Sequence, residues 1–416
     1  MWEKLRINED RFHRDFEALA KIGATSDGGV DRPAFSPAHS KARQWFLQRA
    51  AAAGLKTNVD SAGNHSALYP CGRPKAQVVL LGSHLDSVPS GGRFDGALGV
   101  LAALEVLRTV KENGLRFNTD LEAVDFTDEE GRFLGFLGSR ALTGNLKTED
   151  LSFSTTTKPT FRKALNSTGL TPESILSAAR NKKTLSGYLE LHIEQGPVLE
   201  AQKKDIGIVT GITGILSFSL TFTGIAGHAG TFPMEKRKDA GWAAASFILA
   251  VRRILLNKFP GCTATVGKLH LEPGAVNVIP RQAVLSLEFR AGDRTTLEKL
   301  ESVLLSATEK TVRRYGTKLD IVPMEKTPPV PTSSIIQKTI QKTCRCLGLS
   351  SLHMTSGAGH DAQILARICP AGLIFIPSIG GISHSPRENT RWKDCVNGAN
   401  ILLQTALSLA ETKDIP

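Results

Sequence analysis

The chain has 416 residues, of which 41% are hydrophobic and 22% charged, and its formal net charge is +11. This length predicts two domains, and the composition excludes a disordered chain. No apolar run approaches the roughly 20 residues of a membrane helix. The N-terminus is mixed in charge and lacks the apolar core of a signal peptide, and six scattered cysteines fit a reducing compartment. We therefore expect a cytoplasmic protein without a membrane anchor.

The excess of basic residues does not indicate nucleic-acid binding. Lysines and arginines alternate with acids along most of the chain, and aromatic residues make up only 6%, too few for base-stacking platforms. We expect a solvated basic surface and no nucleic-acid partner. Such a surface would also attract small anionic substrates.

The first part of the chain alternates helices and strands. The pattern predicts a helix over 38–54, a buried strand over 77–82, an apolar helix over 97–112, and strands over 121–126 and 189–193, with a short helix through Val198. The stretch 145–185 is polar and gives no clear pattern. Strands separated by helices predict an α/β fold with a mostly parallel sheet flanked by helices.

The pattern changes near Gly214. Apolar and polar residues alternate over 216–222, which predicts a strand with one wet face. A helix over 239–256, strands over 263–271 and 283–290, a helix over 295–315 and a strand over 319–323 complete a β-α-β-β-α-β order, typical of a ferredoxin-like α+β unit. A proline-rich linker over 327–331, a strand over 373–377 and a helix over 392–411 follow. We predict a domain made of residues 1–213 plus 329–416, with residues 214–328 inserted.

Polar side chains follow several of these strands, where active sites of open α/β sheets form. They are His84 and Asp86, Asp95 in a glycine-flanked turn, Glu129 and Glu130, His192, and His384. Imidazoles and carboxylates brought to one sheet edge favour a divalent metal, and a third histidine favours two ions with Asp95 as the bridge. Asp86 could orient His84. Each residue alone also fits a structural role, such as a packed histidine or a helix cap, and the pattern alone leaves that alternative open.

Longer motifs around these residues resemble a known family. Gly82–Pro89 and Gly91–Gly96 resemble the N-carbamoyl-L-amino-acid hydrolases, grouped with allantoate amidohydrolases and yeast-type β-ureidopropionases among relatives of aminoacylase and carboxypeptidase G. The resemblance extends to Thr127–Gly131, His192–Pro197, His228–Thr231, Ser356–Ala362 and Gly381–Pro386. It implies a dimetal catalytic domain and an inserted lid and dimerisation domain.

The resemblance also implies roles for single residues. His84 and His192 would hold one metal, Glu130 and His384 the other, with Asp95 bridging. Glu129 would be the general base, with Asp86 orienting His84 and His228 stabilising the oxyanion. Substrate contacts would come from Gln195 to the amide, from Asn277 and Arg290 to the carboxylate, and from the glycine loop that ends at Gly359.

The implied reaction is hydrolysis of an N-carbamoyl-L-amino acid to the amino acid, ammonia and carbon dioxide. We expect two divalent ions per subunit, zinc first, with manganese, cobalt or nickel as alternatives. Allantoate amidohydrolase is the nearest alternative, followed by β-ureidopropionase and aminoacylase or dipeptidase; a non-catalytic binding protein is the alternative from another class. We also expect a homodimer in which the strand over 216–222 lies at a sheet edge and carries His228 to the partner's site.

Overall fold

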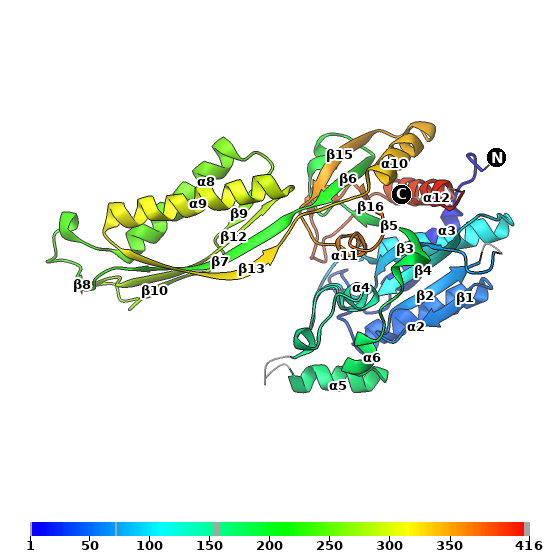
Figure 1. The fold of residues 1–416 in the computed structure, drawn as a ribbon, viewed down its shortest axis with the longest axis horizontal. Helices are drawn as coiled ribbons and strands as arrows, with labels where there is room; N and C mark the ends of the chain where they lie inside the picture. The colour runs from blue at the N-terminus through cyan, green and yellow to red at the C-terminus, as the bar shows by residue number, and fades with distance from the viewer. Residues whose placement is uncertain (1, 71–72, 153–157, 412–416) are drawn as a thin grey trace. The chain divides into compact units, whose positions relative to one another are not determined.

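The computed structural model describes residues 2–70, 73–152 and 158–411 (Figure 1). The chain divides into two compact units. Unit 1 is formed by Met1–Thr210, Thr332–Met354 and Ala358–Pro416, and unit 2 by Gly211–Pro331 and Thr355–Gly357. Unit 2 is thus inserted into a unit built from both ends of the chain. The roles expected of the two units, catalysis for one and lid and dimerisation for the other, stay predictions.

A mixed sheet forms the centre of unit 1. Its middle strands run in the order β4-β3-β5-β16 and are parallel, with β2 and β1 added antiparallel at one side and β6 antiparallel at the other. This is the mostly parallel α/β sheet expected from the sequence. The strands are β1 (Lys56–Val59), β2 (His65–Tyr69), β3 (Val78–His84), β4 (Asp120–Phe126), β5 (Leu185–Ile193), β6 (Ile206–Ile212), β15 (Ser351–Ser356) and β16 (Ala371–Ile376).

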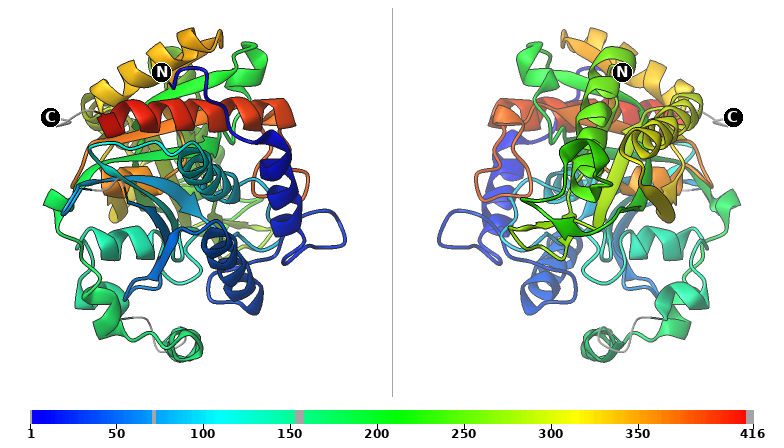
Figure 2. Two further views of the ribbon diagram at one scale, coloured as in Figure 1. Left: turned by 90° about the vertical axis from the view of Figure 1, so that its right-hand side faces the viewer. Right: turned by 90° about the vertical axis from the view of Figure 1, so that its left-hand side faces the viewer.

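Helices cover both faces of this sheet, which explains why β3, β5 and β16 are buried along their whole length. Helices α3 (Ala97–Glu112) and α12 (Trp392–Glu411) pack on each other and on β3 and β5, and their side chains share one core with Leu189 and Leu191 (Figure 2). Side chains alternate along a strand, so Glu190 points to the opposite face. There its carboxylate accepts a hydrogen bond from Ala362 N of α11 (Asp361–Leu365).

The other helices of unit 1 frame this core. They are α1 (Glu9–Ala20), α2 (Pro37–Ala52), α4 (Leu137–Leu142), α5 (Lys158–Thr168), α6 (Pro172–Leu176), α7 (Val198–Ala201) and α10 (Ser334–Cys346). Helices α5 and α6 lie in the stretch 145–185, where no element was predicted; residues 153–157 of it lie outside the described residues. The short helix expected through Val198 begins at that residue instead.

Unit 2 has an antiparallel sheet with strand order β10-β12-β7-β13, and β9 pairs with β12 further along. Buried and half-exposed residues alternate along β7 and β12, as the sequence predicts for one covered face. Helices α8 and α9 cover that face. The elements are β7 (Gly214–Thr223), β8 (Gly227–His228), α8 (Ala240–Lys258), β9 (Thr263–Thr265), β10 (Leu269–Glu272), β11 (Val278–Ile279), β12 (Gln282–Ala291), α9 (Arg294–Tyr315), β13 (Lys318–Thr327) and β14 (Val330–Pro331).

This topology overturns one expectation. The strand over 216–222 belongs to β7, which lies between β12 and β13 and has both its backbone edges paired. It therefore cannot join a second copy by edge pairing. The stretch 263–271, expected as one strand, is two short strands, β9 and β10, and these lie along the side of β12 away from β7.

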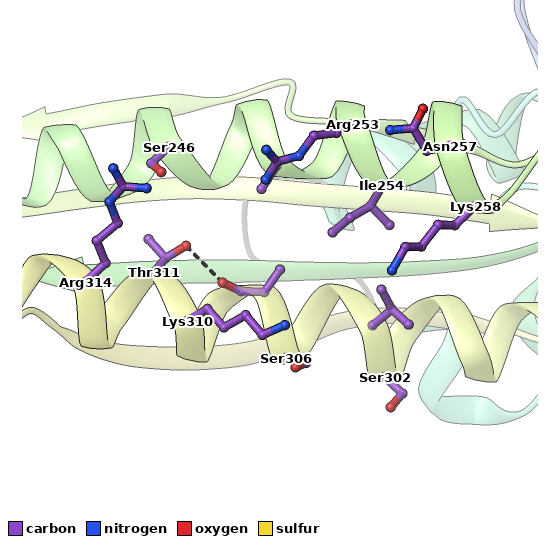
Figure 3. A pocket seen from close by; sticks show the side chains of 13 residues that line it. Ser246, Arg253, Ile254, Asn257, Lys258, Ser302, Ser306, Lys310, Thr311 and Arg314 are labelled. Atoms are coloured by element: carbon purple, nitrogen blue, oxygen red, sulfur yellow. Dashed lines mark hydrogen bonds between the residues drawn. The ribbon is translucent and has the colours of Figure 1, made fainter.

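The outer surface of the helical layer of unit 2 is basic. A groove of about 620 Å³ runs between α8 and α9, and Figure 3 shows Arg253 and Lys258 of α8 with Lys310 and Arg314 of α9 along it. By length and composition alone α8 could also cross a membrane. Its buried face packs on the sheet of unit 2.

Candidate metal centre

The predicted ligands come from the carboxyl ends of parallel strands. His84 is the last residue of β3, His192 lies one residue before the end of β5, and Glu129 and Glu130 follow β4. His384 lies in the loop after β16, and Asp95 in the turn before α3. Because β4, β3, β5 and β16 are parallel neighbours, all these groups reach the same edge of the sheet.

Asp95 lies between two groups of potential ligands. Its Oδ1 is 3.0 Å from Nε2 of His192 and 3.6 Å from Nε2 of His84, and its Oδ2 is 3.3 Å from Nε2 of His384. The last imidazole is also 3.6 Å from Oε2 of Glu130. The structure thus contains two clusters, His84–Asp95–His192 and Asp95–Glu130–His384, in which Asp95 is the shared member.

The contacts of Nδ1 turn Nε2 of both imidazoles toward Asp95. Nδ1 of His84 lies 3.0 Å from the carbonyl oxygen of Asp86, and Nδ1 of His192 lies 2.9 Å from that of Ile193. Each Nδ1 must carry a proton to donate to a carbonyl, so in the neutral ring Nε2 presents a lone pair. Two lone pairs then face one carboxylate oxygen. In addition, Oε1 of Glu130 is buried and has no hydrogen-bond partner in the described structure. These donors suit divalent ions.

The acids and bases of this cluster shift one another's pKa. Burial opposes protonation of His84 and His192, but the neighbouring carboxylates, Asp95 among them, raise the pKa of both. The hydrogen bond to Asp95 raises the pKa of His384 to about 9. Burial raises the pKa of Glu130 to about 7. A divalent cation would displace these protons, so metal binding should release them.

Two glycines give the Asp95 turn its shape. Gly96 has φ of 62°, and a Cβ at this position would lie 2.4 Å from the ring of His84. A Cβ on Gly92 would lie 2.0 Å from the carboxylate of Glu388. The backbone must therefore pass close to the imidazole on one side and to a buried acid on the other. Only glycine allows both approaches.

Glu129 is nearly buried, and its Oε2 lies 3.5 Å from Nε2 of His84. Burial raises its pKa well above the usual value, and Asp361 and Glu130 add to the effect while His84 opposes it. Asp86 lies against His84, where the resemblance implies an orienting role. Its backbone carbonyl oxygen is 3.0 Å and its Oδ1 3.7 Å from Nδ1 of His84, and its carboxylate also accepts hydrogen bonds from the backbone N–H groups of Glu129 and Glu130. Asp86 thus holds two loops of the site together.

Gln195 lies against the shared carboxylate. Its Nε2 donates to Oδ2 of Asp95 at 2.8 Å and lies 3.2 Å from the hydroxyl of Ser383. Its Oε1 is buried without a partner in the described structure. The residue has φ of 57°, a conformation that non-glycine residues rarely adopt and that clusters at functional sites. The amide thus offers one unused acceptor beside Asp95.

The predicted site residues of unit 2 do not come together within one chain. His228 of β8 and Val278 of β11 are directly paired. Asn277 lies next to them, and its backbone carbonyl oxygen accepts a hydrogen bond from Ala229 N. Arg290 lies at the other end of β12, eight residues from Gln282, which is about 27 Å along a strand. It is held by Glu288 and by the carbonyl oxygen of Gly357. Asn277 and Arg290 of one chain therefore cannot bind the same carboxylate, and their roles toward the substrate stay predictions.

Gly359 belongs to unit 1, in the loop before α11. A Cβ there would lie 2.7 Å from Cζ of Phe136, so the loop passes close to an aromatic ring. The helix that follows has only five residues, and its first backbone N–H groups are already partly used, since Ala362 N donates to Glu190.

Sequence reasoning missed several buried polar residues around the centre. Glu388 accepts hydrogen bonds from the backbone of the Asp95 turn and from Ser383. His360 lies against His192, with ring centroids 4.6 Å apart, and Glu190 is close to both. Both oxygens of Glu190 already accept hydrogen bonds, from Ser83 and Ala362, so this third group serves as scaffold. Glu388 lies two residues beyond the motif Gly381–Pro386, and this position near His384 was the one feature of the sequence that could have indicated its role.

The fold and the clustered ligands define a metal-dependent hydrolase built on an α/β sheet. The family model described as peptidase family M20/M25/M40 matches residues 80–408, and the chain belongs to this family.

Proteins similar over their whole length narrow the comparison. The chain is 38% identical to an N-carbamoyl-L-amino acid amidohydrolase of Geobacillus stearothermophilus, covering 97% of this chain and 99% of that protein. It is 33% identical to the allantoate amidohydrolase of Bacillus subtilis, covering 98% and 100%. A solved amidase of the hydantoinase/carbamoylase family from Burkholderia multivorans has a TM-score of 0.91 at 33% identity, covering 99% and 100%. These findings confirm the resemblance and the fold class expected from the motifs.

Proposed function

We propose that this protein hydrolyses N-carbamoyl-L-amino acids to the free amino acid, ammonia and carbon dioxide. The observation that carries the proposal is the shared carboxylate of Asp95 between two ligand clusters, with the buried Glu129 beside them. The identity of 38% to an amidohydrolase named for this substrate class supports it. We place the reaction in unit 1 and assign unit 2 as lid and dimerisation domain.

The ligand set fits two divalent ions, zinc first, with manganese, cobalt or nickel as alternatives, because imidazole and carboxylate donors accept all four. His84 and His192 would hold one ion, Glu130 and His384 the other, and Asp95 both. When bound, the ions supply Lewis acidity that polarises the ureido carbonyl and acidifies a water.

Glu129 moves the protons of the reaction. Its carboxylate is buried and lies 3.5 Å from Nε2 of His84, and Asp86 holds its backbone N–H, so it is placed to accept a proton from the attacking water. The same group, now protonated, donates to the leaving nitrogen. A raised pKa suits both steps, because the acid must hold the proton between them.

Gln195 and Arg290 bind the substrate in this proposal. Gln195 would contact the ureido amide of the substrate; its Oε1 is buried and has no hydrogen-bond partner among the described residues. Arg290 has five N–H donors, of which Glu288 and Gly357 use only part, and the remainder can bind the substrate carboxylate. The glycine loop ending at Gly359 would add backbone donors to the same anion.

His228 and Asn277 point to a second copy of the chain. They lie at the end of the unit 2 sheet remote from Arg290, so one substrate can meet all three only if two chains contribute. We therefore propose a homodimer in which His228 stabilises the oxyanion in the partner's site, and Asn277 contacts the same substrate. In this form of the proposal, Asn277 and Arg290 contact one substrate from two different chains.

The side of unit 2 formed by α8 and the β9–β10 edge supports this dimer. Trp242, Leu249 and Leu256 lie seven residues apart on α8 and are 55%, 69% and 67% exposed. This spacing places them on one face of the helix. Helix α8 packs over β12, β7 and β9, and the free edge strand β10 carries exposed Leu269. An apolar stripe beside an unpaired strand edge is suited to two-fold pairing.

Turnover of a substrate panel tests the function. The zinc-loaded protein should release ammonia from N-carbamoyl-L-amino acids, not from their D-enantiomers, and lose this activity when metal is removed. Allantoate is the second candidate, favoured by the 33% identity to an allantoate amidohydrolase over the full length. A higher kcat/KM for allantoate than for every N-carbamoyl amino acid would assign that function instead. Absence of hydrolysis with both classes, in metal-loaded dimer, would contradict the proposal.

The free thiols of Cys262, Cys344, Cys346, Cys369 and Cys395 support a cytoplasmic location.

A further inference from the structure

Glu388 is a buried acid that no ligand set includes, and it connects the two loops that carry Asp95 and His384. It is 4% exposed. Its Oε1 accepts the backbone N–H groups of Phe94 and Asp95 at 2.9 and 3.1 Å, and its Oε2 accepts the hydroxyl of Ser383 at 2.8 Å. It thus fixes the backbone of the shared ligand and the residue next to His384 with one carboxylate.

The hydrogen-bond directions around Ser383 follow from counting protons. The hydroxyl has one proton, and Glu388 at 2.8 Å is a closer acceptor than Oδ2 of Asp95 at 3.3 Å. The amide of Gln195 has two protons, and it lies within reach of Asp95 and Ser383. One consistent arrangement is therefore Gln195 to Asp95, Gln195 to Ser383 and Ser383 to Glu388. It leaves a lone pair of Asp95 Oδ2 facing His384.

We propose that Glu388 is a positioning residue for the metal centre, which orients Asp95 and the His384 loop so that the cluster Asp95–Glu130–His384 is formed before the ion arrives. The effect should fall mainly on this cluster, because the His384 side chain is 53% exposed while those of His84 and His192 are 2% exposed. The inner imidazoles are held by their own strands. The His384 loop depends more on the link through Ser383.

Gly92 provides a second observation for the contact between Glu388 and the Asp95 turn, because it has no side chain. Glu388 occupies the space that a Cβ on Gly92 would need, with its carboxylate carbon and Oε1 both at 2.0 Å. The turn Gly91–Asp95 is thus shaped around this acid. A carboxylate merely capping its own loop would not require a glycine in a turn 296 residues earlier in the chain.

Replacing Glu388 by glutamine keeps the size of the side chain but changes its hydrogen bond to Ser383. In Glu388→Gln the amide oxygen can still accept the Phe94 and Asp95 N–H groups, but its NH₂ group must donate to Ser383. The hydroxyl of Ser383 then turns to its other acceptor, Oδ2 of Asp95, and uses the lone pair that faces His384. Glu388→Ala removes all three acceptor contacts. Metal affinity should therefore fall in the order wild type, Gln, Ala.

Glu200→Gln is the matched control. This acid accepts one backbone N–H, from Gly380, on the same loop before His384, but it has no link to the Asp95 turn. The substitution changes charge and side-chain chemistry in the same way. It should leave metal affinity within about twofold of the wild type.

The experiment is a zinc titration of metal-free protein against a chromogenic chelator, with thermal unfolding of the metal-free forms alongside. Two zinc ions bound by the wild type establish the centre on which this inference rests; failure at this step would count against the proposed function. We expect Glu388→Gln to weaken the second ion about 10–100-fold, the range for outer residues of metal sites, with excess zinc restoring most of the turnover rate.

Two results would overturn the inference. One is a second zinc bound by Glu388→Gln and Glu388→Ala as tightly as by the wild type, whatever their activity. The other is a lower unfolding temperature of the metal-free variants with unchanged zinc affinity, since that result would make Glu388 a purely structural residue.

Discussion

Replacing Glu129 by glutamine tests the proton transfer directly. The side chain is 9% exposed, its backbone N–H is held by Asp86, and its Oε2 faces His84 at 3.5 Å. Glutamine has the same shape but cannot accept the proton of the attacking water. A positioned acid or base contributes about 10²–10⁴-fold to the rate, so the activation free energy should rise by about 3–5 kcal/mol. Metal content should stay unchanged, because Glu129 is not one of the proposed ligands.

The assay is kcat/KM for an N-carbamoyl-L-amino acid, with zinc measured on the same sample. Glu194→Gln is the control, since Glu194 is also buried, with 8% of its surface exposed, but accepts hydrogen bonds from Val198 N and Leu199 N at the start of α7. It should stay within about tenfold of the wild type. If Glu129→Gln carries both ions and also hydrolyses substrate within tenfold of the wild-type rate, another group must accept the proton.

Four further perturbations test other parts of the proposal. Chelation should abolish turnover and zinc should restore it; elemental analysis must show that the chelated sample is metal-free, and activity in such a sample would contradict the metal centre. Arg290→Ala should weaken kcat/KM for a carboxylate substrate by about 1.5–3 kcal/mol but spare its amide analogue, whereas Arg281→Ala, whose partner is Glu272, should affect neither. Inactive His228→Ala and Glu129→Gln chains, refolded together, should regain activity in heterodimers verified by mass, and dead heterodimers would exclude a shared site. Burial, together with Arg43, lowers the pKa of His65 to about 3. The unfolded chain, with a His pKa of about 6.5, therefore binds the proton first as pH falls. The free energy of unfolding should decrease by up to about 2 kcal/mol from pH 7 to pH 5, less in His65→Asn, and equal pH dependence of the two proteins in denaturant melts would refute this.

The candidate metal centre could be predicted from the sequence because the predicted ligands follow strands. A buried apolar run such as 77–82 identifies a parallel strand, and the residue after it must lie at the carboxyl edge of the sheet. His84, Glu130 and His192 come from three neighbouring strands by this rule alone. Their roles needed the family resemblance, because the strand pattern does not say which carboxylate binds an ion.

The prediction that the strand over 216–222 lies at a sheet edge was wrong, and the sequence pattern itself explains why. Alternation over 216–222 shows that one face of the strand is covered, but it says nothing about the strand's edges. In a β-α-β-β-α-β unit the first strand is central, here between β12 and β13, so the ferredoxin-like prediction already excluded an exposed edge at β7. The exposed stripe on α8 could not be identified from sequence, because α8 is apolar on both faces and only packing shows which is covered.

Residues that support the ligands are harder to predict than the ligands themselves. Asp86 was expected to orient His84, and its carbonyl oxygen and Oδ1 both lie near Nδ1 of that ring, but the hydrogen bonds from the backbone of Glu129 and Glu130 to its carboxylate were not predicted. Glu388 meets Phe94 from 294 residues away. Such contacts leave no local period in the sequence. They do require glycine where another side chain lies too close for a Cβ atom. Glu388 lies against Gly92 in this way, and the His84 ring lies against Gly96. The glycines of this motif thus mark close contacts around the candidate metal centre. Glycines beside a candidate ligand indicate that a side chain from another part of the chain packs against that loop.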